Sequence, residues 1–381
     1  MNRRQLLTML GSFAAPIALA SCQSALQKEP RTDAASKKIF FPPAPDVPRI
    51  QHLTTFSGEA DLVPKTDTGF ASFVLGDKSH ADKLVQPYGC AMHDGKLYVV
   101  DTGGARLVRF DLVAQHYDVL RGSGAGVFQR PINITIDSDG TKYVCDAGRK
   151  RMMVLDADDN FIASFGQRHG IKPVDCAVVG DVLHVVDISA HRVVTLDKHD
   201  GRLINSFGRP GSKPGEMFHP TNIDVGPDGD LFIVETSNFR VQRFTPTGEH
   251  RRLYGAIGDG PGKFARPKGL AIDRVGRIFV GDSAFENVQV FNPDGQLLMY
   301  FGSNQTPPLR LNLPAGISID YDNVKLFERY ADTDFQVEYL IMVASQFGPN
   351  KVDVFGFGKK VGAYNSLATA QLATTVPNHV V

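Results

Sequence analysis

Six prolines recur along the chain, and the residues that follow them are the first place to look for chemistry. The intervals are 44, 42, 47, 47 and 47 residues, between Pro87, Pro131, Pro173, Pro220, Pro267 and Pro314. The residues directly after them are Tyr88, Ile132, Val174, Thr221, Lys268 and Ala315. None is an imidazole or a carboxylate, and Lys268 would repel a cation, whereas a catalytic zinc normally needs three protein ligands. We therefore expect no catalytic zinc here, and treat Tyr88, Thr221 and Lys268 as candidate ligand-binding residues.

Side-chain oxygen atoms occur one position later. This set reads Gly89, Asn133, Asp175, Asn222, Gly269 and Gly316. Asn133, Asp175 and Asn222 lie in consecutive repeats, and oxygen atoms suit a hard cation such as calcium. Gly, Asn and Asp are also the residues that most readily adopt a positive φ. We therefore favour a backbone requirement at this position, with a structural calcium ion at Asn133, Asp175 and Asn222 as the alternative.

Other polar residues that recur once per repeat favour structural roles. Five repeats contain a β-branched run that ends in an acid: Asp101, Asp146, Asp187, Glu235 and Asp282. A group needed once per repeat is expected to accept hydrogen bonds in the following turn rather than to catalyse. The same argument applies to the repeated basic residues, Arg106, Arg151, Arg192 and Arg240. His93 and His219 are isolated, so no catalytic residue is predicted.

Short strands must position all of these residues. An apolar strand follows each proline, and turn pairs such as Asp94-Gly95 come next, which are strong hairpin signals. The second run of each repeat, for example Tyr98-Val99-Val100, is apolar at successive positions, which indicates that both of its faces are buried. Repeats of this length with four strands are typical of propeller blades. The sequence therefore predicts an all-β fold, a six-bladed β-propeller with four-stranded antiparallel blades, over residues 49–358.

One fourth strand is missing from the repeats and is supplied by the N-terminal part of the propeller. Only five repeats contain a fourth strand, whereas residues 50–58, before the first repeat, end like the fourth strands at Phe165, Phe207 and Phe301. We expect this N-terminal strand to complete the last blade, because closure hides two sheet edges. The last repeat also carries an insertion, residues 320–335, in which Lys325–Tyr330 is expected to form one or two helical turns.

The repeat resembles the NHL-repeat family, whose blades carry G-x-F-x-x-P before a strand. The matching residues are Gly126, Phe128 and Pro131, and again Gly262, Phe264 and Pro267. The resemblance covers about residues 50–358 and implies the propeller fold, which by itself does not define a function. Related propellers include amidating lyases and gluconolactonase-type lactonases, whose metal ligands directly follow the corresponding proline. Their ligand types are absent from Tyr88 and its five equivalents, which argues against that chemistry here.

The first residues predict export and lipid anchoring. Residues 1–21 combine Arg3 and Arg4 with an apolar stretch too short to span a bilayer, as in a signal peptide. The stretch ends in Leu19-Ala20-Ser21-Cys22, which resembles a lipobox with Cys22 as the lipidated residue. The paired arginines also resemble a twin-arginine signal, so the export route stays open. We expect a tether at 22–48, a C-terminal tail at 359–381, and a lipoprotein in the outer membrane or at the periplasmic face.

Charge and cysteine content exclude several classes of protein. The chain has 41 basic and 41 acidic residues, which indicates no overall affinity for nucleic acid. Beyond Cys22 the cysteines are Cys90, Cys145 and Cys176, without CxxC spacing. This pattern excludes a zinc ribbon and covalently attached c-type haem, and we expect three buried thiols.

These observations lead to a prediction about function. We expect a non-catalytic, monomeric propeller that binds or scaffolds an envelope protein, with no cofactor apart from the calcium alternative. Two alternatives stay open: a metal-dependent lactonase or amidating-lyase-like enzyme with atypical ligands, and a sensor that binds a small molecule in the channel.

Overall fold

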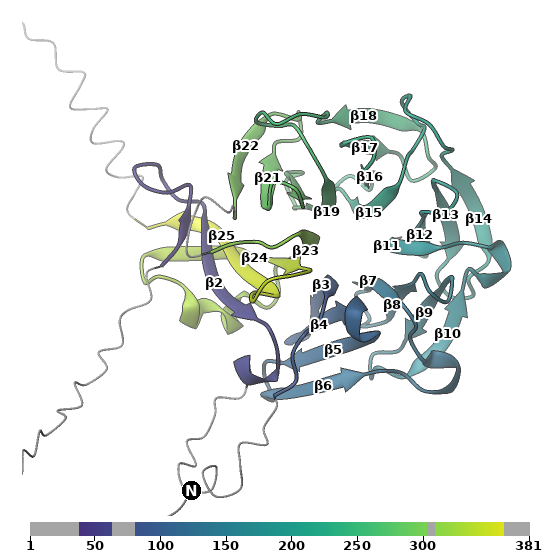
Figure 1. The fold of residues 1–381 in the computed structure, drawn as a ribbon, viewed down its shortest axis with the longest axis horizontal. Coiled ribbons are helices and arrows are strands. Elements are labelled where there is room, and N and C mark those ends of the chain that lie inside the picture. The colour runs from purple at the N-terminus through teal and green to yellow at the C-terminus, as the bar shows by residue number, and fades with distance from the viewer. Residues whose placement is uncertain (1–37, 63–80, 303–308, 362–381) are drawn as a thin grey trace, which may run out of the picture. The chain divides into compact units, whose positions relative to one another are not determined.

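The computed structural model describes residues 38–62, 81–302 and 309–361, and in this part of the chain six sheets form a ring (Figure 1). The inner strands, one per blade, are β3 (Pro87–His93), β7 (Pro131–Ile136), β11 (Pro173–Val179), β15 (Pro220–Val225), β19 (Pro267–Ile272) and β23 (Pro314–Asp320). The second strands are β4 (Lys96–Asp101), β8 (Lys142–Asp146), β12 (Val182–Asp187), β16 (Leu231–Glu235), β20 (Ile278–Asp282) and β24 (Phe335–Ser345). The predicted six-bladed propeller is confirmed.

The outer half of each blade is built in the same order. The third strands are β5 (Arg106–Asp111), β9 (Arg151–Leu155), β13 (Arg192–Asp197), β17 (Arg240–Phe244), β21 (Asn287–Phe291) and β25 (Val352–Lys360). The fourth strands are β6 (His116–Leu120), β10 (Phe161–Phe165), β14 (Leu203–Phe207), β18 (His250–Tyr254), β22 (Leu297–Phe301) and β2 (Ile50–Phe56). Short 3₁₀ turns are η1 (Glu59–Asp61), η2 (Thr102–Gly104), η3 (Gly124–Gly126), η4 (Gln167–His169), η5 (Val324–Leu326) and η6 (Glu328–Tyr330). No helix among the described residues is long and apolar enough to cross a membrane.

The ring is closed by the N-terminal strand, as predicted. Strand β2 pairs antiparallel with β25, with Ile50 opposite Phe357 and Phe56 opposite Val352, and a further short strand, β1 (Phe40–Phe41), pairs with β2. In Figure 1 the purple β2 lies beside the yellow β25. The buried Gln51 side chain adds a second connection, because it accepts a hydrogen bond from the Asp332 backbone at 3.0 Å and donates one to the Tyr330 carbonyl at 3.3 Å. Blade six therefore combines both ends of the described chain.

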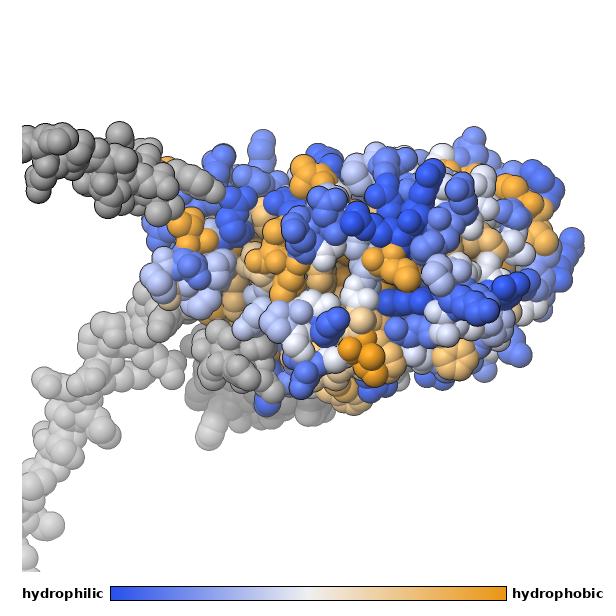
Figure 2. Space-filling view, turned by 90° about the horizontal axis from the view of Figure 1, so that it is seen from above, coloured by the Kyte–Doolittle hydropathy of each residue, from blue (hydrophilic) through white to orange (hydrophobic). Residues whose placement is uncertain are grey.

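Each inner strand begins at a proline and contacts the inner strands of the two neighbouring blades. A proline fits the first position of a strand because its missing N–H is not needed there. The second strands are buried on both faces, as Val99 and Val100 show with 0% exposure. Hydrophilic residues dominate the outer edge of the ring, where apolar side chains form separate patches (Figure 2). The core therefore lies between the blades rather than at the ring axis.

The acids that end the second strands hold the loops before the prolines. Asp101 accepts hydrogen bonds from the backbone N–H groups of Val85 and Gln86, and Asp282 does so from those of Ala265 and Arg266. A hydroxyl next to the acid then ties one blade to the next in three places: Thr102 to Pro131, Thr236 to Pro267 and Ser283 to Pro314, at 2.7, 2.7 and 2.6 Å. The predicted structural role of these acids is therefore confirmed.

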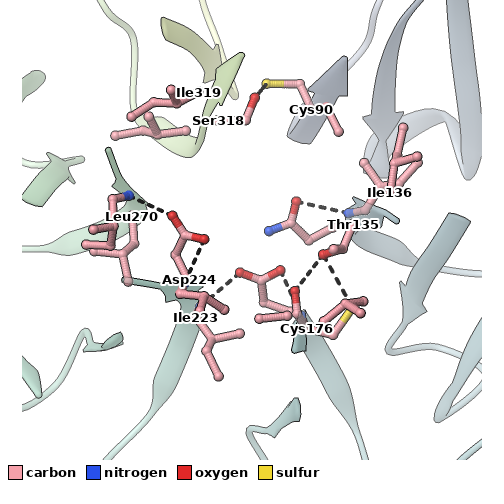
Figure 3. Close-up of a pocket in the computed structure, with 18 of the residues that line it drawn as sticks. Cys90, Thr135, Ile136, Cys176, Ile223, Asp224, Leu270, Ser318 and Ile319 are labelled. Carbon is pink, nitrogen blue, oxygen red and sulfur yellow. Dashed lines mark hydrogen bonds between the residues drawn. The ribbon is translucent and has the colours of Figure 1, made fainter. Parts of the chain in front are cut away.

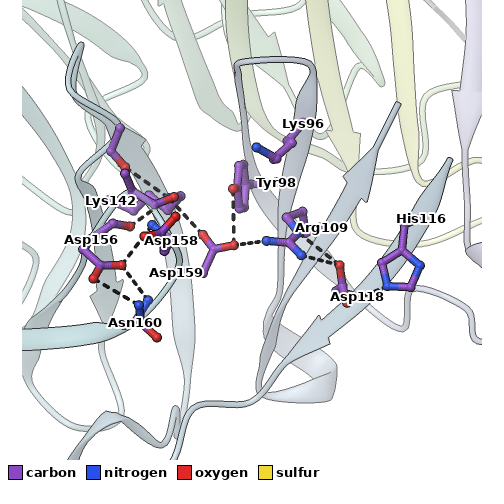
Figure 4. Close-up of polar contacts among 12 residues, drawn as sticks. Lys96, Tyr98, Arg109, His116, Asp118, Lys142, Asp156, Asp158, Asp159 and Asn160 are labelled. Atoms are coloured by element: carbon purple, nitrogen blue, oxygen red, sulfur yellow. Dashed lines mark hydrogen bonds and ion pairs between the residues drawn. The ribbon is translucent and has the colours of Figure 1, made fainter. Parts of the chain in front are cut away.

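Blades one and two are joined by a buried polar cluster (Figure 4). The Lys142 side chain is 1% exposed and donates to the carbonyl oxygen atoms of Gly140, Asp156 and Ala157. Its ammonium group lies 2.9 Å from an Asp159 carboxylate oxygen and 5.1 Å from the centre of the Tyr98 ring. Asp159 also pairs with Arg109 of blade one. One carboxylate therefore compensates two cations from adjacent blades.

Candidate functional site

The inner strands approach one another closely at the second position after each proline. None of Gly89, Asn133, Asp175, Asn222, Gly269 and Gly316 has a positive φ. A Cβ added to Gly89 would come 1.8 Å from Asn133 Oδ1, and one added to Gly316 would come 2.3 Å from the Tyr88 carbonyl oxygen. The expected backbone requirement at this position is therefore wrong. The glycines provide room for neighbouring strands, and no left-handed conformation accounts for the side chains of Asn133, Asp175 and Asn222.

A cavity of about 380 Å³ lies on the ring axis and is lined by all six inner strands (Figure 3). It extends from Asn133 and Asp175 to Asp137 and Tyr321 near the hairpin ends of the strands. The fourth position after the proline is always small or short: Ala91, Thr135, Ala177, Asp224, Ala271 and Ser318. Five of these six residues, all but Ala271, line the cavity. The small side chains therefore explain why the axis is hollow, and the volume is within the range of small-molecule sites.

Asp175 lies at the closed end of this cavity and is 5% exposed. Its two carboxylate oxygen atoms accept hydrogen bonds from the backbone N–H groups of Cys176 at 2.9 Å and of Ile223, in the next blade, at 3.0 Å. Burial raises the pKa of Asp175 to about 8, and the negative charge of Asp224 adds to this rise, while the N–H donors oppose it. Asp175 is therefore mostly protonated at neutral pH.

Asp224 reaches the same cavity from blade four. Its carboxylate accepts hydrogen bonds from the backbone N–H groups of Val225 at 2.8 Å and of Ile272, in blade five, at 2.6 Å. Burial raises the pKa of Asp224 to about 6, so this group is mostly ionised at neutral pH. Among the described residues, no lysine, arginine or histidine forms an ion pair with Asp175 or Asp224. Two carboxylates of different pKa thus face one cavity.

The sequence interpretation missed Asp224. It examined only the two positions after each proline, whereas Asp224 occupies the fourth position, where the other five residues are Ala, Thr or Ser. A single acid in a set of small residues is a signal that could have identified it. Register shifts after the proline, such as the one between Pro220 and Asn222, also change which positions face the axis.

The predicted calcium ligands are only partly together. Asn133 and Asp175 line the cavity, whereas Asn222 does not, although its side chain forms a hydrogen bond with Asp175 and its Oδ1 lies 3.5 Å from the Tyr88 hydroxyl. No group of three His, Cys, Asp or Glu side chains among the described residues is placed to hold a metal ion. The calcium site at Asn133, Asp175 and Asn222 therefore stays a prediction.

The predicted ligand-binding residues Tyr88, Thr221 and Lys268 lie at the opposite, proline end of the channel. The Tyr88 side chain from blade one reaches Asn222 of blade four, the blade across the ring. Thr221 is 9% exposed and its hydroxyl lies 3.1 Å from that of Thr236. The Lys268 ammonium donates to Gln346 Oε1 at 3.1 Å and lies 5.6 Å from the Tyr88 ring centre. None of the three lines the central cavity.

The three described cysteines are free and buried, as expected. Cys90 Sγ lies 3.6 Å from Ser318 Oγ at the cavity wall, and Cys176 Sγ lies 3.4 Å from Thr135 Oγ1. Burial raises the pKa of the Cys90 thiol to about 12, which makes this group an inert part of the wall. Cys22 lies outside the described residues, as do the predicted signal peptide and most of the predicted tether and tail.

The described residues form a six-bladed propeller with an acid-lined central cavity, and comparison with known proteins agrees with the propeller fold. No family model matches the chain. A probable peptidyl-alpha-hydroxyglycine alpha-amidating lyase of Caenorhabditis elegans is 23% identical over 168 residues, which are 41% of this chain and 48% of that protein. The chain thus spans about half the length of this curated relative.

Solved structures with the same fold include two enzymes. Virginiamycin B lyase from Staphylococcus aureus is 13% identical with a TM-score of 0.51, over 72% of this chain and 96% of the other. A gluconolactonase from Xanthomonas campestris is 18% identical with a TM-score of 0.52, over 72% and 87%. At these identities the likeness to the solved structures concerns the fold.

The expectation of a non-catalytic scaffold without enzymatic activity is wrong. A relative found by sequence is a probable lyase, and this finding contradicts the expectation. The expectation depended on the residues directly after the prolines, which include no acid, whereas Asp175 and Asp224 line the cavity further along the inner strands.

Proposed function

We propose that this protein is a lyase whose acid–base chemistry takes place in the central cavity. The observation that carries the proposal is the pair Asp175 and Asp224, two carboxylates from neighbouring blades that face one cavity of about 380 Å³. Neighbouring carboxylates whose pKa values differ are typical of enzymes that need one acid and one base. The similarity to an amidating lyase supports the same reaction class.

Each carboxylate has a distinct role in an elimination. Asp224, ionised at neutral pH, removes a proton from a substrate carbon or hydroxyl group and keeps it. The electron pair of the broken C–H or O–H bond forms a new double bond to the adjacent carbon. The bond from that carbon to oxygen or nitrogen breaks, and its electron pair leaves with the oxygen or nitrogen atom. Asp175, protonated at neutral pH, gives its proton to that leaving atom. The backbone N–H donors to both groups keep the carboxylates in place during the transfer.

A lactonase is the second candidate, because the donors that face the cavity are oxygen atoms. A hard cation held at Asn133 and Asp175 would polarise a substrate carbonyl, which is the chemistry that such an ion supplies. The two candidates make opposite demands on Asp175, since a proton donor must be neutral and a metal ligand must be ionised. Activity that survives dialysis against a chelator favours the lyase, and activity that calcium restores favours the lactonase.

The proposal can be tested with three substrates taken from the relatives: a peptidyl-α-hydroxyglycine, a streptogramin B antibiotic and a gluconolactone. We expect turnover of at least one, a loss of about 100-fold or more in Asp224→Asn, and a comparable loss in Asp175→Asn. Asp137→Asn, at the far end of the cavity, is the matched control and should retain activity. Equal activity in all four proteins would refute catalysis by this pair.

We also propose that the chain is an exported lipoprotein anchored through Cys22. The support is the run Leu19-Ala20-Ser21-Cys22 behind a charged and then apolar leader. The anchor would hold the propeller at the envelope, in the outer membrane or at the periplasmic face. Cys22→Ala should lose palmitate labelling and leave the membrane fraction, and an unchanged membrane fraction would contradict the anchor.

A further inference from the structure

Basic side chains gather where the chain enters the inner strands. The residues directly before the six prolines are Gln86, Arg130, Lys172, His219, Arg266 and Leu313. The backbone N–H groups of Arg130, Lys172 and Arg266 donate to the buried acids Asp146, Asp187 and Asp282 at 2.9, 3.0 and 3.0 Å. The fold therefore constrains the backbone at these positions and leaves the choice of side chain open.

Four of the basic side chains at this end of the channel lack a carboxylate partner. In the described part of the chain, Arg130, Lys172, Arg266 and Lys268, here called the basic collar, form no ion pair. By contrast Arg106, Arg192 and Arg240 on the same face are each paired with the acid of their own blade. Two of the neighbouring buried acids, Asp146 and Asp282, also form no ion pair among the described residues, so unpaired basic side chains outnumber unpaired acidic ones four to two at the collar.

Lys268 is the deepest member of the collar. Its side chain is half-buried, and among the described residues its ammonium group contacts neutral groups, the Gln346 amide oxygen at 3.1 Å and the Tyr88 ring. Burial lowers the pKa of Lys268 to about 8, and the positive charge of Arg266 adds to this decrease. A partly desolvated ammonium group without a counter-ion is costly, and an anionic ligand would remove that cost.

The collar is separate from the central cavity. The Tyr88 side chain crosses the channel to Asn222, and Tyr88, Ile132, Val174 and Ala315 belong to one buried apolar cluster between the two. None of the residues directly after the prolines lines the cavity that holds Asp175 and Asp224. A ligand at the collar would therefore be recognised independently of the chemistry proposed above.

We propose that the proline end of the channel is an anion-binding site in which Arg130, Lys172, Arg266 and Lys268 recognise a small molecule with two or more carboxylate or phosphate groups. Guanidinium groups present several N–H donors in one plane and match both kinds of anion, and Lys268 adds a point charge at the base. Four charges spread around one mouth fit a multivalent anion better than a single carboxylate.

The site can be tested by isothermal titration calorimetry at low ionic strength, where surface charges are least screened. Citrate and inorganic pyrophosphate are the two probes, and they distinguish carboxylate from phosphate recognition. We expect saturable binding of at least one probe, weakened about tenfold or more in Lys268→Met and in Arg266→Gln. Arg252→Gln removes an equal charge from the outer strand β18 and should bind like the unchanged protein. Melting temperatures of all variants confirm that they are folded.

Further outcomes decide the proposal. Binding should weaken above about pH 8, because Lys268 then loses its proton and its positive charge. The groups that face Lys268 are Tyr88, Arg266 and Gln346, and none of them gains a positive charge as the pH rises. If neither probe bound, or if Lys268→Met and Arg252→Gln had the same affinity, the site would be overturned. Asp224→Asn should bind the probe normally, so that a failure of the proposed catalysis is distinguishable from a failure of this site.

Discussion

At the scale of single residues, Asp175 and Asp224 differ in how deeply the propeller buries them. Both accept two backbone N–H hydrogen bonds, which lower the pKa of a carboxyl group, yet burial outweighs these bonds in both cases. Asp175 is the more enclosed and also experiences the charge of Asp224. In the reaction proposed above, an aspartate would therefore act as the acid in one blade and as the base in the next.

This difference predicts a bell-shaped pH profile for the reaction. Asp224 accepts a proton only when ionised, so activity should rise as the pH passes about 6. Asp175 donates only while protonated, so activity should fall as the pH passes about 8. Initial rates between about pH 5 and 9 measure the profile. In Asp224→Asn the rise in rate near pH 6 should be absent. A rate of the unchanged protein that is constant over this pH range would contradict the assigned roles.

At the scale of elements, the hairpin β9–β10 contacts blade one through an apolar cluster and through one buried carboxylate, Asp159. Asp159 has a φ of 70° and lies next to both Lys142 and Arg109, so it compensates two cations from one turn. Lys142 is almost fully buried and depends on this charge and on three carbonyl oxygen atoms. Breaking a buried pair by removing one partner is strongly destabilising, because the other charge stays buried.

Asp159→Asn keeps the shape of the side chain and tolerates the positive φ, but removes the charge. We expect it to lower the free energy of unfolding by about 3 kcal/mol, measured by urea denaturation. The neighbouring Asp158→Asn, on an exposed side chain, is the control and should change it by less than about 0.5 kcal/mol. Adding Lys142→Met to Asp159→Asn should recover part of the loss. If the two single variants were equally stable, the cluster would not join the blades.

The sequence predicts the ring more completely than it predicts the site. Proline spacing, turn pairs and doubly apolar runs each report local structure, and together they determine six blades and the closure by residues 50–58. The arrangement of the channel depends on two structural features that a local sequence pattern does not reveal. The register shift behind each proline decides which side chains face the axis, and the ring diameter allows Tyr88 to reach Asn222 in the opposite blade. Asp224 was visible in the sequence only as an exception among small residues.

At the scale of the whole molecule, stability depends on strand β2. It provides the outer strand of blade six and brings Ile50 and Phe56 into two different interblade cores, both at 3% exposure or less. Deletion of residues 23–46 removes only β1 from the described sheets. Deletion through Gly58 removes β2 as well and exposes the edge of β25.

We therefore expect the shorter deletion to stay folded and monomeric, and the longer one to aggregate or to melt at a much lower temperature. Thermal unfolding and size-exclusion chromatography of the two truncated proteins provide the measurement. If both melted at the same temperature, β2 would not be needed to close the ring.

Closure by β2 also delays the completion of the ring during synthesis. The ribosome makes Ile50 some 310 residues before Lys360, the last residue of its partner strand β25. At 5–20 residues per second the nascent chain waits roughly 15 to 60 seconds for that partner. During this interval β2, with its buried residues Ile50, Leu53 and Phe56, has no partner strand, so the ring of completed blades cannot close. A chaperone that shields residues 50–56 on the ribosome would matter more for this protein than for a propeller whose blades are each made from one continuous segment.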